Sequence, residues 1–398
     1  MDKIRILHII KDDKFFDPIY ELFETYDAFK NDYVLFVSSK QYSFKRIKNT
    51  RVVNVVFGNK NIKKILLSNT YDIVYLHSIS ISTIKYLSYI PKDKTIIWWA
   101  WGYDIYGTEG GMPSLINIPL YRTYTKQLIN SNAILSFAKK IVKRVLAIVP
   151  TFQRKNIIRR VSYFQPVLSI EYTMLCNIKY FRAKEFYIIS KLPQIKDYYI
   201  TSHFTEPLNK ACVKPCNGNI IIGNSASPFN NHLDLWNSIE KYVPSDREVL
   251  IPVSYGGDMS YVANIKSRIS SEKCHIRFIE NYMSRDDYWK LLDSCSYAIY
   301  GSVRQHAMGN IYHDLLNGIK VFLYSDSVIF RYLKSVGYVV YAIEDVDVNS
   351  FFTPMSVEEI GQNLKARKNE FEYCKSIEEA AIKNIQKDIS FINNKRSF

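Results

Sequence analysis

Two polar loops in the second half of the chain carry residue types that suit phosphate binding. Residues 223–232 read GNSASPFNNH and residues 301–310 read GSVRQHAMGN, and each loop follows an apolar run. Small residues between a strand and a helix present backbone N–H groups to phosphate, and the forked guanidinium of Arg304 matches phosphate oxygens. We therefore expect the two loops to hold a diphosphate between them. The alternative for residues 223–232 is an ordinary helix N-cap.

Two shorter turns in the same half could also approach a ligand. Residues 252–258 read PVSYGGD, so that Tyr255 stands beside two glycines where backbone could come close to a bound molecule. Residues 279–283 read IENYM and contain Glu280, which we expect to meet a nucleobase.

The first half holds an aromatic cluster with a single acid. Residues 98–107 read WWAWGYDIYG, which places three of the chain's five tryptophans close together. Flat apolar rings stack on sugars, and a carboxylate can take a hydroxyl proton. Asp104 is therefore the preferred general base, and His77, at the end of another apolar run, is the second candidate. The candidate sugar-binding residues are Trp99, Trp101 and Tyr106.

Both assignments have an ordinary structural alternative. The tryptophans could fill the core of the first half, because large aromatic side chains are buried in most proteins. His77 could be a hydrogen-bonded histidine at a strand end.

The sequence predicts neither a metal nor a cofactor. It contains no H-E-x-x-H and no nucleophile elbow, and its paired acids lack a third ligand nearby. The six cysteines are scattered; Cys212 and Cys216 are close, but no second pair completes a zinc site, so we expect reduced thiols. The negative charge of a bound diphosphate must then be met by Arg304, helix N-termini and backbone amides.

Apolar runs alternate with helical patterns in both halves and position these loops. This alternation is typical of doubly wound α/β sheets, whose ligands bind at the carboxyl ends of the strands. The sequence predicts an α/β fold of two Rossmann-like doubly wound domains facing a cleft. The expected strands are residues 3–10, 33–37, 52–57, 73–76, 95–99, 219–223, 249–253, 275–279, 297–300 and 321–324.

A joint at residues 214–218 (KPCNG) separates the two series of strands. We expect an N-terminal domain over residues 1–214 and a second Rossmann-like domain over residues 215–345. Residues 346–398 are rich in Glu, Lys and Asn and should form helices that close the chain.

The segment 110–170 contains no Asp or Glu but ten Lys and Arg. On a helical wheel, residues 134–149 place apolar side chains on about half of the circumference and cations on the other half. A basic amphipathic helix of this kind suits a membrane interface with anionic lipid. The alternative is a helix docked on its own sheet with a solvated basic face. The cations expected at the membrane are Lys139, Lys140, Lys143 and Arg144.

The overall composition limits the class of protein. Hydrophobic residues make up 47% and charged residues 23% of 398, which fits a protein with a full core and excludes disorder, collagen and coiled coil. The net charge of +15 predicts attraction to nucleic acid, an anionic membrane or a phosphorylated ligand. No apolar run approaches the roughly 18 residues of a membrane span, and the N-terminus reads as a strand, so we expect a cytoplasmic location.

At these loops the sequence resembles glycosyltransferase family 56. The family comprises bacterial 4-acetamido-4,6-dideoxygalactose transferases of enterobacterial common antigen assembly, also described as 4-alpha-L-fucosyltransferases. The resemblance spans most of the chain in the same order. The residues that carry it are WAWGYDIY at 99–106, IGNS at 222–225 with Asn230 and His232, Pro252 with Tyr255, Arg304-Gln305 with Gly309, and His77.

The resemblance implies a GT-B fold with an N-terminal acceptor domain and a C-terminal domain for a nucleotide-diphosphate sugar, which in the family is a dTDP-linked deoxyamino sugar. It also implies a lipid-diphosphate-linked glycan acceptor at the cytoplasmic face of the inner membrane. The enzyme would then be peripheral on that membrane and serve O-antigen, capsule or common-antigen assembly. From the loop positions and the resemblance together, the expected donor contacts are Gly223, Asn224, Ser225, Asn230, Tyr255, Glu280, Arg304, Gln305, His306, Gly309 and Asn310.

Two other classes of protein remain open. A nucleotide-sugar epimerase or hydrolase shares the two-domain fold but would need acids around the sugar in both halves. A basic nucleic-acid-binding protein fits the charge and the aromatic content. Its cations, however, gather on one amphipathic segment, and no RNA-binding motif of the ribonucleoprotein type is present. We therefore expect no nucleic-acid partner.

Overall fold

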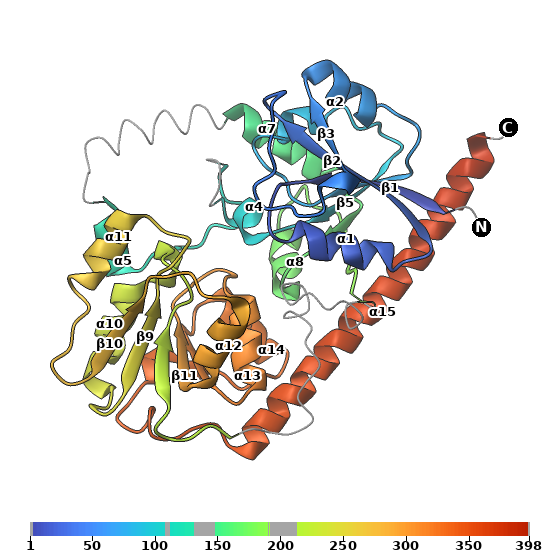
Figure 1. Cartoon of the computed structure of the whole chain (residues 1–398). Helices are drawn as coiled ribbons and strands as arrows, with labels where there is room; N and C mark the ends of the chain where they lie inside the picture. The colour runs from blue at the N-terminus through green and yellow to red at the C-terminus, as the bar shows by residue number, and fades with distance from the viewer. Residues whose placement is uncertain (1–2, 108–111, 131–147, 190, 192–212, 397–398) are drawn as a thin grey trace. The chain divides into compact units, whose positions relative to one another are not determined.

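A computed structural model describes residues 3–107, 112–130, 148–189, 191 and 213–396 of the chain (Figure 1). These residues form two compact units, each with one β-sheet. Their described residues fall within Met1–Asn117, Lys140–Phe204 and Phe371–Phe398 for unit 1, and within Ile118–Lys139 and Thr205–Glu370 for unit 2.

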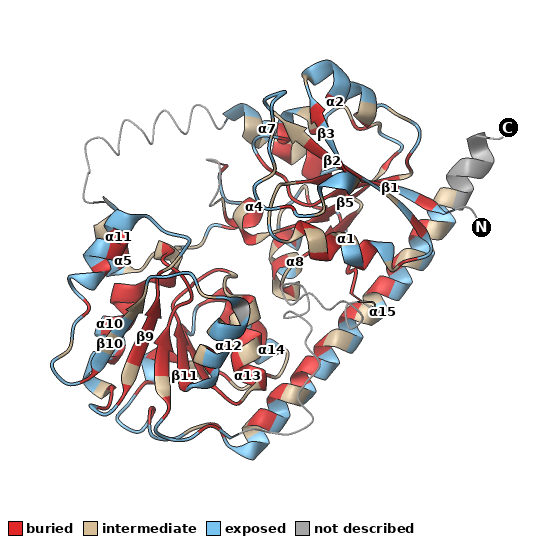
Figure 2. Cartoon of the chain, viewed as in Figure 1, coloured by how far each residue is buried: buried red, intermediate tan, exposed pale blue. Residues whose placement is uncertain are grey.

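Unit 1 contains a seven-stranded sheet in the order β3-β2-β1-β4-β5-β6-β7, with every neighbouring pair parallel. Its central strands are rich in Ile, Val and aromatic residues and are largely buried (Figure 2). Helices that cover both faces of a parallel sheet produce such burial. The strands are β1 (Ile4–Ile10), β2 (Phe29–Val37), β3 (Val53–Phe57), β4 (Ile73–Leu76), β5 (Thr95–Trp99), β6 (Tyr163–Gln165) and β7 (Lys184–Glu185).

Amphipathic helices connect the strands of unit 1. In the first of them, Phe16, Ile19 and Phe23 recur at helical spacing and are buried, which explains why this stretch folds as a helix against the sheet. The helices are α1 (Phe16–Glu24), α2 (Asn59–Leu66), α3 (Ile84–Leu87), α4 (Gly102–Tyr106), α7 (Ile148–Ile158) and α8 (Ser169–Cys176).

Unit 2 contains a six-stranded parallel sheet in the order β10-β9-β8-β11-β12-β13. Its central strands β8 and β11 are largely buried, and β11 is buried along its whole length. The strands are β8 (Asn219–Ile222), β9 (Glu248–Pro252), β10 (His275–Ile279), β11 (Cys295–Tyr300), β12 (Lys320–Leu323) and β13 (Tyr341–Ala342).

The helices of unit 2 include one from an earlier part of the chain. They are α5 (Thr123–Asn130), α10 (His232–Ile239), α11 (Met259–Lys266), α12 (Arg285–Asp293), α13 (Met308–Leu316), α14 (Val328–Ser335) and the first part of α15 (Val357–Arg396).

Helix α15 contributes to both units, and a buried glutamate anchors each part. In unit 2, Glu370 accepts hydrogen bonds from three tyrosine hydroxyls and pairs with Arg367 at 2.7 Å. In unit 1, Glu378 accepts hydrogen bonds from the Tyr26 hydroxyl and from the backbone N–H of Ile189. The tyrosines around Glu370 are Tyr312, Tyr332 and Tyr338.

The ten expected strands all overlap strands of the structure, and the α/β expectation of two doubly wound sheets is confirmed. Strand β2 begins at Phe29, four residues earlier than expected, because polar Lys30, Asn31 and Asp32 interrupt its apolar pattern. Strands β6, β7 and β13 were not predicted, because they are only two or three residues long.

Helix α5 lies in unit 2, although the sequence expectation assigned it to the first domain. The Asp234 carboxylate accepts hydrogen bonds from the backbone N–H groups of Tyr124 and Thr125 and from the Thr125 hydroxyl, at 2.7–2.9 Å. Asp234 thereby caps a helix more than 100 residues away in the chain. Arg122 adds an ion pair with Asp326 and lies over the Tyr324 ring.

Most of the expected amphipathic helix at residues 134–149 lies outside the described residues. This holds for Lys139, Lys140, Lys143 and Arg144. Ile148 and Val149 are described; they begin α7, and each is 64% exposed.

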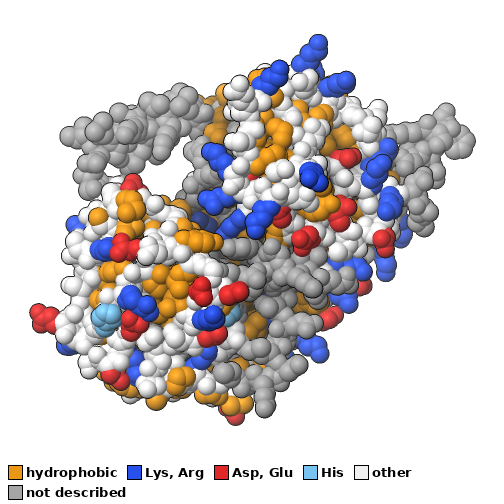
Figure 3. Space-filling model, viewed as in Figure 1, with side chains coloured by type: hydrophobic (Ala, Val, Ile, Leu, Met, Phe, Trp, Pro, Cys, Tyr) orange, Lys and Arg blue, Asp and Glu red, His pale blue; other side chains and the backbone are white. Residues whose placement is uncertain are grey.

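Lys and Arg side chains outnumber Asp and Glu on the face of unit 1 that Figure 3 shows. This face accounts for part of the net charge of +15. A surface of this sign attracts anions from solution.

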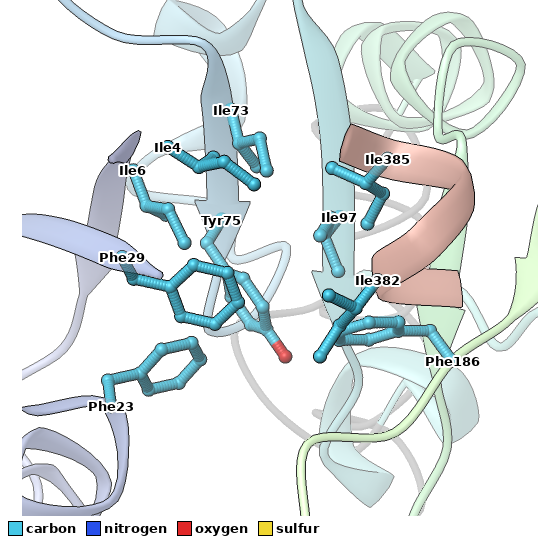
Figure 4. A pocket seen from close by; sticks show the side chains of 10 residues that line it. All are labelled: Ile4, Ile6, Phe23, Phe29, Ile73, Tyr75, Ile97, Phe186, Ile382 and Ile385. Atoms are coloured by element: carbon cyan, nitrogen blue, oxygen red, sulfur yellow. The ribbon is translucent and has the colours of Figure 1, made fainter. Parts of the chain in front are cut away.

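A small apolar cavity lies between the sheet of unit 1 and α15 (Figure 4). Its volume is about 10 Å³, which leaves room for one water at most. The hydroxyl of Tyr75, which donates to Gln165 at 2.6 Å, is the one polar side-chain group in its wall. A cavity with such a lining stays empty of water and is a packing gap, not a substrate site.

The capping role of Asp234 can be tested by removing its carboxylate. Asp234→Ala removes three hydrogen bonds to the start of α5 and should destabilise that end by about 1–2 kcal/mol. Hydrogen–deuterium exchange of the peptide over residues 122–130 should then accelerate. Asp258→Ala is the matched control, because Asp258 caps only its own helix through the N–H of Ser260. Unchanged exchange in Asp234→Ala would contradict the capping role.

Candidate active site

The carboxyl ends of β8 and β11 mark the point in unit 2 where the strand order reverses. The chain passes from β8 to β9 on one side and from β11 to β12 on the other. Sheets of this order bind their ligands at that point, because the connections leave in opposite directions. The two polar loops at residues 223–232 and 301–310 follow these two strands. The structure therefore brings together the loops that the sequence analysis selected.

The two loops are in direct contact, and glycine makes that contact sterically feasible. Within the first loop, Gly223 has φ +70°, and a Cβ there would lie 3.0 Å from Nε2 of His232. A Cβ on Gly301 would clash with the carbonyl oxygen of Asn230. Asn231, itself in the left-handed region, donates from Nδ2 to the Gly301 carbonyl at 2.7 Å and so ties the loops together.

Buried polar atoms in both loops have no hydrogen-bond partner, and Nε2 of His232 is one of them. Asn230 donates from Nδ2 to the Ser225 carbonyl at 2.8 Å, but its Oδ1 accepts nothing. Nδ1 of His306 in the other loop is likewise buried and unpartnered. Such an atom costs about 1–3 kcal/mol, and most buried polar groups in proteins are satisfied. Their occurrence in both loops indicates a place that a polar ligand completes.

Arg304 supplies positive charge near His306. Its side chain is nearly buried, with 9% of the residue exposed, and Nη1 donates to the Gln305 carbonyl at 2.6 Å. The guanidinium lies 4.5 Å from the centre of the Phe229 ring, which stacks on Tyr121. Burial lowers the pKa of His306 to about 3, and the charge of Arg304 acts in the same direction. A cation beside a neutral imidazole suits an anionic ligand.

The remaining candidate donor residues divide into near and distant ones. Tyr255 follows β9 and touches the first loop, since its hydroxyl accepts from Nδ2 of Asn224 at 3.4 Å and its carbonyl accepts from the Ala226 N–H at 2.7 Å. Asn310 donates to the Tyr288 hydroxyl at 2.8 Å. Glu280 instead follows the edge strand β10 and pairs with Lys266 on the surface. The structure therefore does not bring Glu280 to the two loops.

Unit 1 has the same reversal of strand order, between β1 and β4. His77 directly follows β4 there and is 5% exposed. Its Nε2 lies 2.8 Å from Nδ1 of His8 on β1, while its Nδ1 is buried without a partner. Burial lowers the pKa of His77 well below its ordinary value, and His8 adds to this effect. His77 is therefore a neutral base at neutral pH.

The carboxylate of Asp104 has more hydrogen-bond partners than the imidazole of His77. Its two carboxylate oxygens accept hydrogen bonds from the backbone N–H groups of Trp101 and Ile79 and from Nε1 of Trp98, at 2.7–3.1 Å. The residue is 2% exposed. Burial raises its pKa to about 7, although the three donors act against this rise. The geometry gives Asp104 a role in joining the ends of β4 and β5 to the start of α4.

The aromatic candidates form a stack in place of an open platform. Trp99 and Trp101 stack on each other at 5.3 Å, and Phe15 covers the next position at 4.7 Å from Trp101. Tyr106 is buried and donates its hydroxyl to Glu171 at 2.9 Å. The structure thus fits the core-filling alternative for Tyr106 and leaves little ring face for a sugar on the tryptophans.

No three His, Cys, Asp or Glu side chains among the described residues lie close enough to hold a metal ion. None of the described helices is long and apolar enough to cross a membrane.

Three further residues contact the candidate residues and were not predicted from the sequence. His8 lies inside a strand, Asn231 inside a loop already selected for other residues, and Tyr121 about 100 residues before the loop it supports. For His8, the available signal was a single polar residue in the apolar run IRILHII.

Comparison with solved structures defines the fold. The chain aligns over nearly its whole length with HepE from Anabaena, solved with UDP and glucose (12% identity, TM-score 0.51, 99% of both chains). It also aligns with α,α-trehalose 6-phosphate synthase from Burkholderia multivorans (7%, TM-score 0.56, 100% of this chain and 98% of that one). Sucrose-phosphate synthase from Thermosynechococcus elongatus gives 8% identity and a TM-score of 0.55, over 97% and 99% of the two chains. The fold is therefore that of GT-B glycosyltransferases, as the sequence predicted.

The family follows from the sequence itself. Residues 152–351, half of the chain, match the family described as 4-alpha-L-fucosyltransferase, glycosyl transferase group 56. The chain belongs to this glycosyltransferase family, which confirms the resemblance and the assignment as an enzyme. No curated protein matches the chain.

The buried histidines predict how stability depends on pH. Burial lowers the pKa of His306 to about 3, whereas an unfolded histidine takes up a proton below about 6.5. The contribution of the neutral His306 ring to the free energy of unfolding is therefore fully present above pH 6.5 and is lost as the pH falls toward 3. From pH 7 to pH 5 the wild type should lose about 2 kcal/mol relative to His306→Gln, measured by urea unfolding. His275→Gln, at an exposed side chain, is the control. An equal pH dependence of wild type and His306→Gln would contradict the assignment.

Proposed function

We propose that this enzyme transfers a deoxyamino sugar from a dTDP-linked donor to a lipid-diphosphate-linked glycan in bacterial surface polysaccharide assembly. The observation that carries the donor site is the pair of unpartnered buried atoms, Oδ1 of Asn230 and Nδ1 of His306, at the strand-order reversal of unit 2. Membership of family 56 supports the choice of donor and acceptor.

In this proposal the loops after β8 and β11 hold the diphosphate of the donor. Arg304 donates to phosphate oxygens, and the backbone around Gly223 and Ser225 supplies further N–H groups. HepE, which shares the fold, binds UDP and glucose in its crystal structure. As the bond between sugar and diphosphate breaks, negative charge grows on the leaving diphosphate, and Arg304 stabilises it.

His77 is the proposed general base in unit 1. The acceptor hydroxyl gives its proton to Nδ1 of His77 while its oxygen forms a bond to the anomeric carbon and the nucleoside diphosphate departs. Nδ1 is unpartnered, whereas both oxygens of Asp104 already accept hydrogen bonds. We therefore prefer His77 to Asp104. A single displacement of this kind inverts the anomeric configuration, so the product anomer should be determined as well.

The proposed acceptor is anionic because it carries a lipid diphosphate. The excess of Lys and Arg on unit 1 in Figure 3 supports this choice by its sign. The acid-free segment 110–170 supports a peripheral location at the cytoplasmic face of the inner membrane, where anionic lipid attracts cations.

The donor site predicts a nucleotide-dependent stabilisation. In a thermal unfolding panel of thymidine, uridine, guanosine and cytidine diphosphates, dTDP should raise the melting temperature most, because a ligand of the folded state stabilises it. Arg304→Gln should raise the dissociation constant by about 10- to 100-fold, or roughly 1.5–3 kcal/mol. Arg331→Gln, on an exposed arginine of the same unit, is the control. Equal binding by Arg304→Gln and wild type would refute the assignment of Arg304. A larger stabilisation by a diphosphate with another nucleobase would contradict the choice of a dTDP-linked donor.

The base assignment predicts a loss of turnover without a loss of binding. His77→Gln should lower kcat by about 10²–10⁴, because a positioned base contributes that factor. The affinity for the nucleoside diphosphate should stay unchanged. Turnover close to that of the wild type would show that the base lies elsewhere.

The membrane proposal predicts that four cations act together. Changing Lys139, Lys140, Lys143 and Arg144 to Gln should release the protein from anionic liposomes, since each contact contributes about 1 kcal/mol. Transfer to a lipid-linked acceptor should slow, and transfer to a short soluble acceptor should not. Unchanged liposome binding by this variant, or the absence of liposome binding by the wild type, would contradict the proposed membrane location.

A further inference from the structure

A chain of side-chain hydrogen bonds connects His77 to the surface of unit 1. Nε2 of His77 lies 2.8 Å from Nδ1 of His8, and Nε2 of His8 lies 3.0 Å from Oδ1 of Asn31. Asn31 in turn donates from Nδ2 to a carboxylate oxygen of Glu24 at 2.9 Å. Four side chains from α1, β1, β2 and the end of β4 thus form one continuous series.

The orientation of the Asn31 amide determines which atom donates and which accepts in each hydrogen bond of the series. Its Nδ2 faces two groups that can only accept, the carboxylate of Glu24 and the carbonyl of Phe23. Its Oδ1 must therefore face His8, and a hydrogen bond at 3.0 Å requires the proton to lie on Nε2 of His8. The opposite orientation would place two oxygens in contact at Glu24.

The direction then passes from His8 to His77. Burial lowers the pKa of His8 to about 3, so the ring is neutral and carries a single N–H. With that proton on Nε2, Nδ1 of His8 is an acceptor, and Nε2 of His77 must donate to it. Nδ1 of His77, which has no partner, is left as a bare lone pair.

Aromatic rings hold the two imidazoles in place. His8 stacks on Tyr33 at 4.5 Å, and His77 stacks on Tyr75 at 4.8 Å. The rings of Phe23 and Trp99 also lie against His77, at 6.0 and 5.9 Å. Glu24 is the one charged side chain in the series, and it acts on His77 only through Asn31 and His8.

We propose that His8, Asn31 and Glu24 are positioning residues that hold His77 in the tautomer with the proton on Nε2 and the lone pair on Nδ1. This inference rests on the proposed function, in which Nδ1 of His77 accepts the proton of the acceptor hydroxyl. The series orients His77 and does not carry the proton away, because the amide of Asn31 is not a proton acceptor at neutral pH. An enzyme whose base depends on a tautomer loses rate when that tautomer is lost.

Nitrogen NMR of the full chain with ¹⁵N-labelled histidine tests the tautomer without any substrate. We expect a protonated Nε2 and a bare Nδ1 for His77 at neutral pH, with its signals assigned by their absence in His77→Gln. In Asn31→Leu, which removes the acceptor for His8, the signals should shift toward the other tautomer. A protonated Nδ1 in the wild type would overturn the proposal.

Kinetics test whether the tautomer matters for transfer. Asn31→Leu should lower kcat by at least about tenfold with both KM values unchanged, as expected when a base is held in the wrong tautomer. The double variant Asn31→Asp, Glu24→Gln restores an acceptor for His8 and a donor for that acceptor, so its kcat should return to within about threefold of the wild type. Asn54→Leu, on an exposed residue of β3, is the control.

Two outcomes separate this inference from the proposed function. Full turnover in His77→Gln would show that His77 is not the base, whereas the tautomer found by NMR would still hold. Reduced turnover in His77→Gln together with wild-type kcat in Asn31→Leu would support His77 as the base. The same result would contradict the positioning role of Asn31, His8 and Glu24. Thermal unfolding of each variant verifies that it is folded.

Discussion

The arrangement of both units depends on one topological constraint, the reversal of strand order beside the first strand of each parallel sheet. At β8 and β11 in unit 2, and at β1 and β4 in unit 1, neighbouring strands send their connections to opposite sides. The polar groups that follow such strands remain available to a ligand, because no helix connection covers them. The loops of Arg304 and Asn230 in unit 2 and His77 in unit 1 all occupy these positions.

The energetic signature of the sites is buried polar atoms without partners. Oδ1 of Asn230, Nδ1 of His306 and Nδ1 of His77 each cost about 1–3 kcal/mol in the unliganded chain, and a correctly placed ligand recovers that energy. Asp104 shows the opposite case. Its carboxylate is as buried as these atoms, but three donors satisfy it, so it stabilises the turn after β5.

The sequence predicted the fold, and the placement of the loops at residues 223–232 and 301–310 on neighbouring strands, better than it predicted the packing of the aromatic cluster in the first half. Ten strands and the loops at residues 223–232 and 301–310 followed from apolar runs and local residue types. Capping of α5 by Asp234 and stacking of Tyr121 on Phe229 join residues about 100 positions apart, and no local pattern reports such contacts. WWAWGYDIYG suggested a sugar platform because its residue types suit one, whereas burial made Trp98 and Tyr106 part of the core. Glu280 follows the edge strand β10, two strands from β8, and its contact with a nucleobase stays a prediction.

The central claim is that the strand-order reversal of unit 2 binds the nucleoside diphosphate of the donor. The most direct measurement is hydrogen–deuterium exchange of the full chain with and without saturating dTDP. The account predicts slower exchange in the peptides that contain residues 223–232 and 301–310, and little change in the peptide of β10 and Glu280. Protection confined to other parts of the chain, or none at saturation, would contradict it.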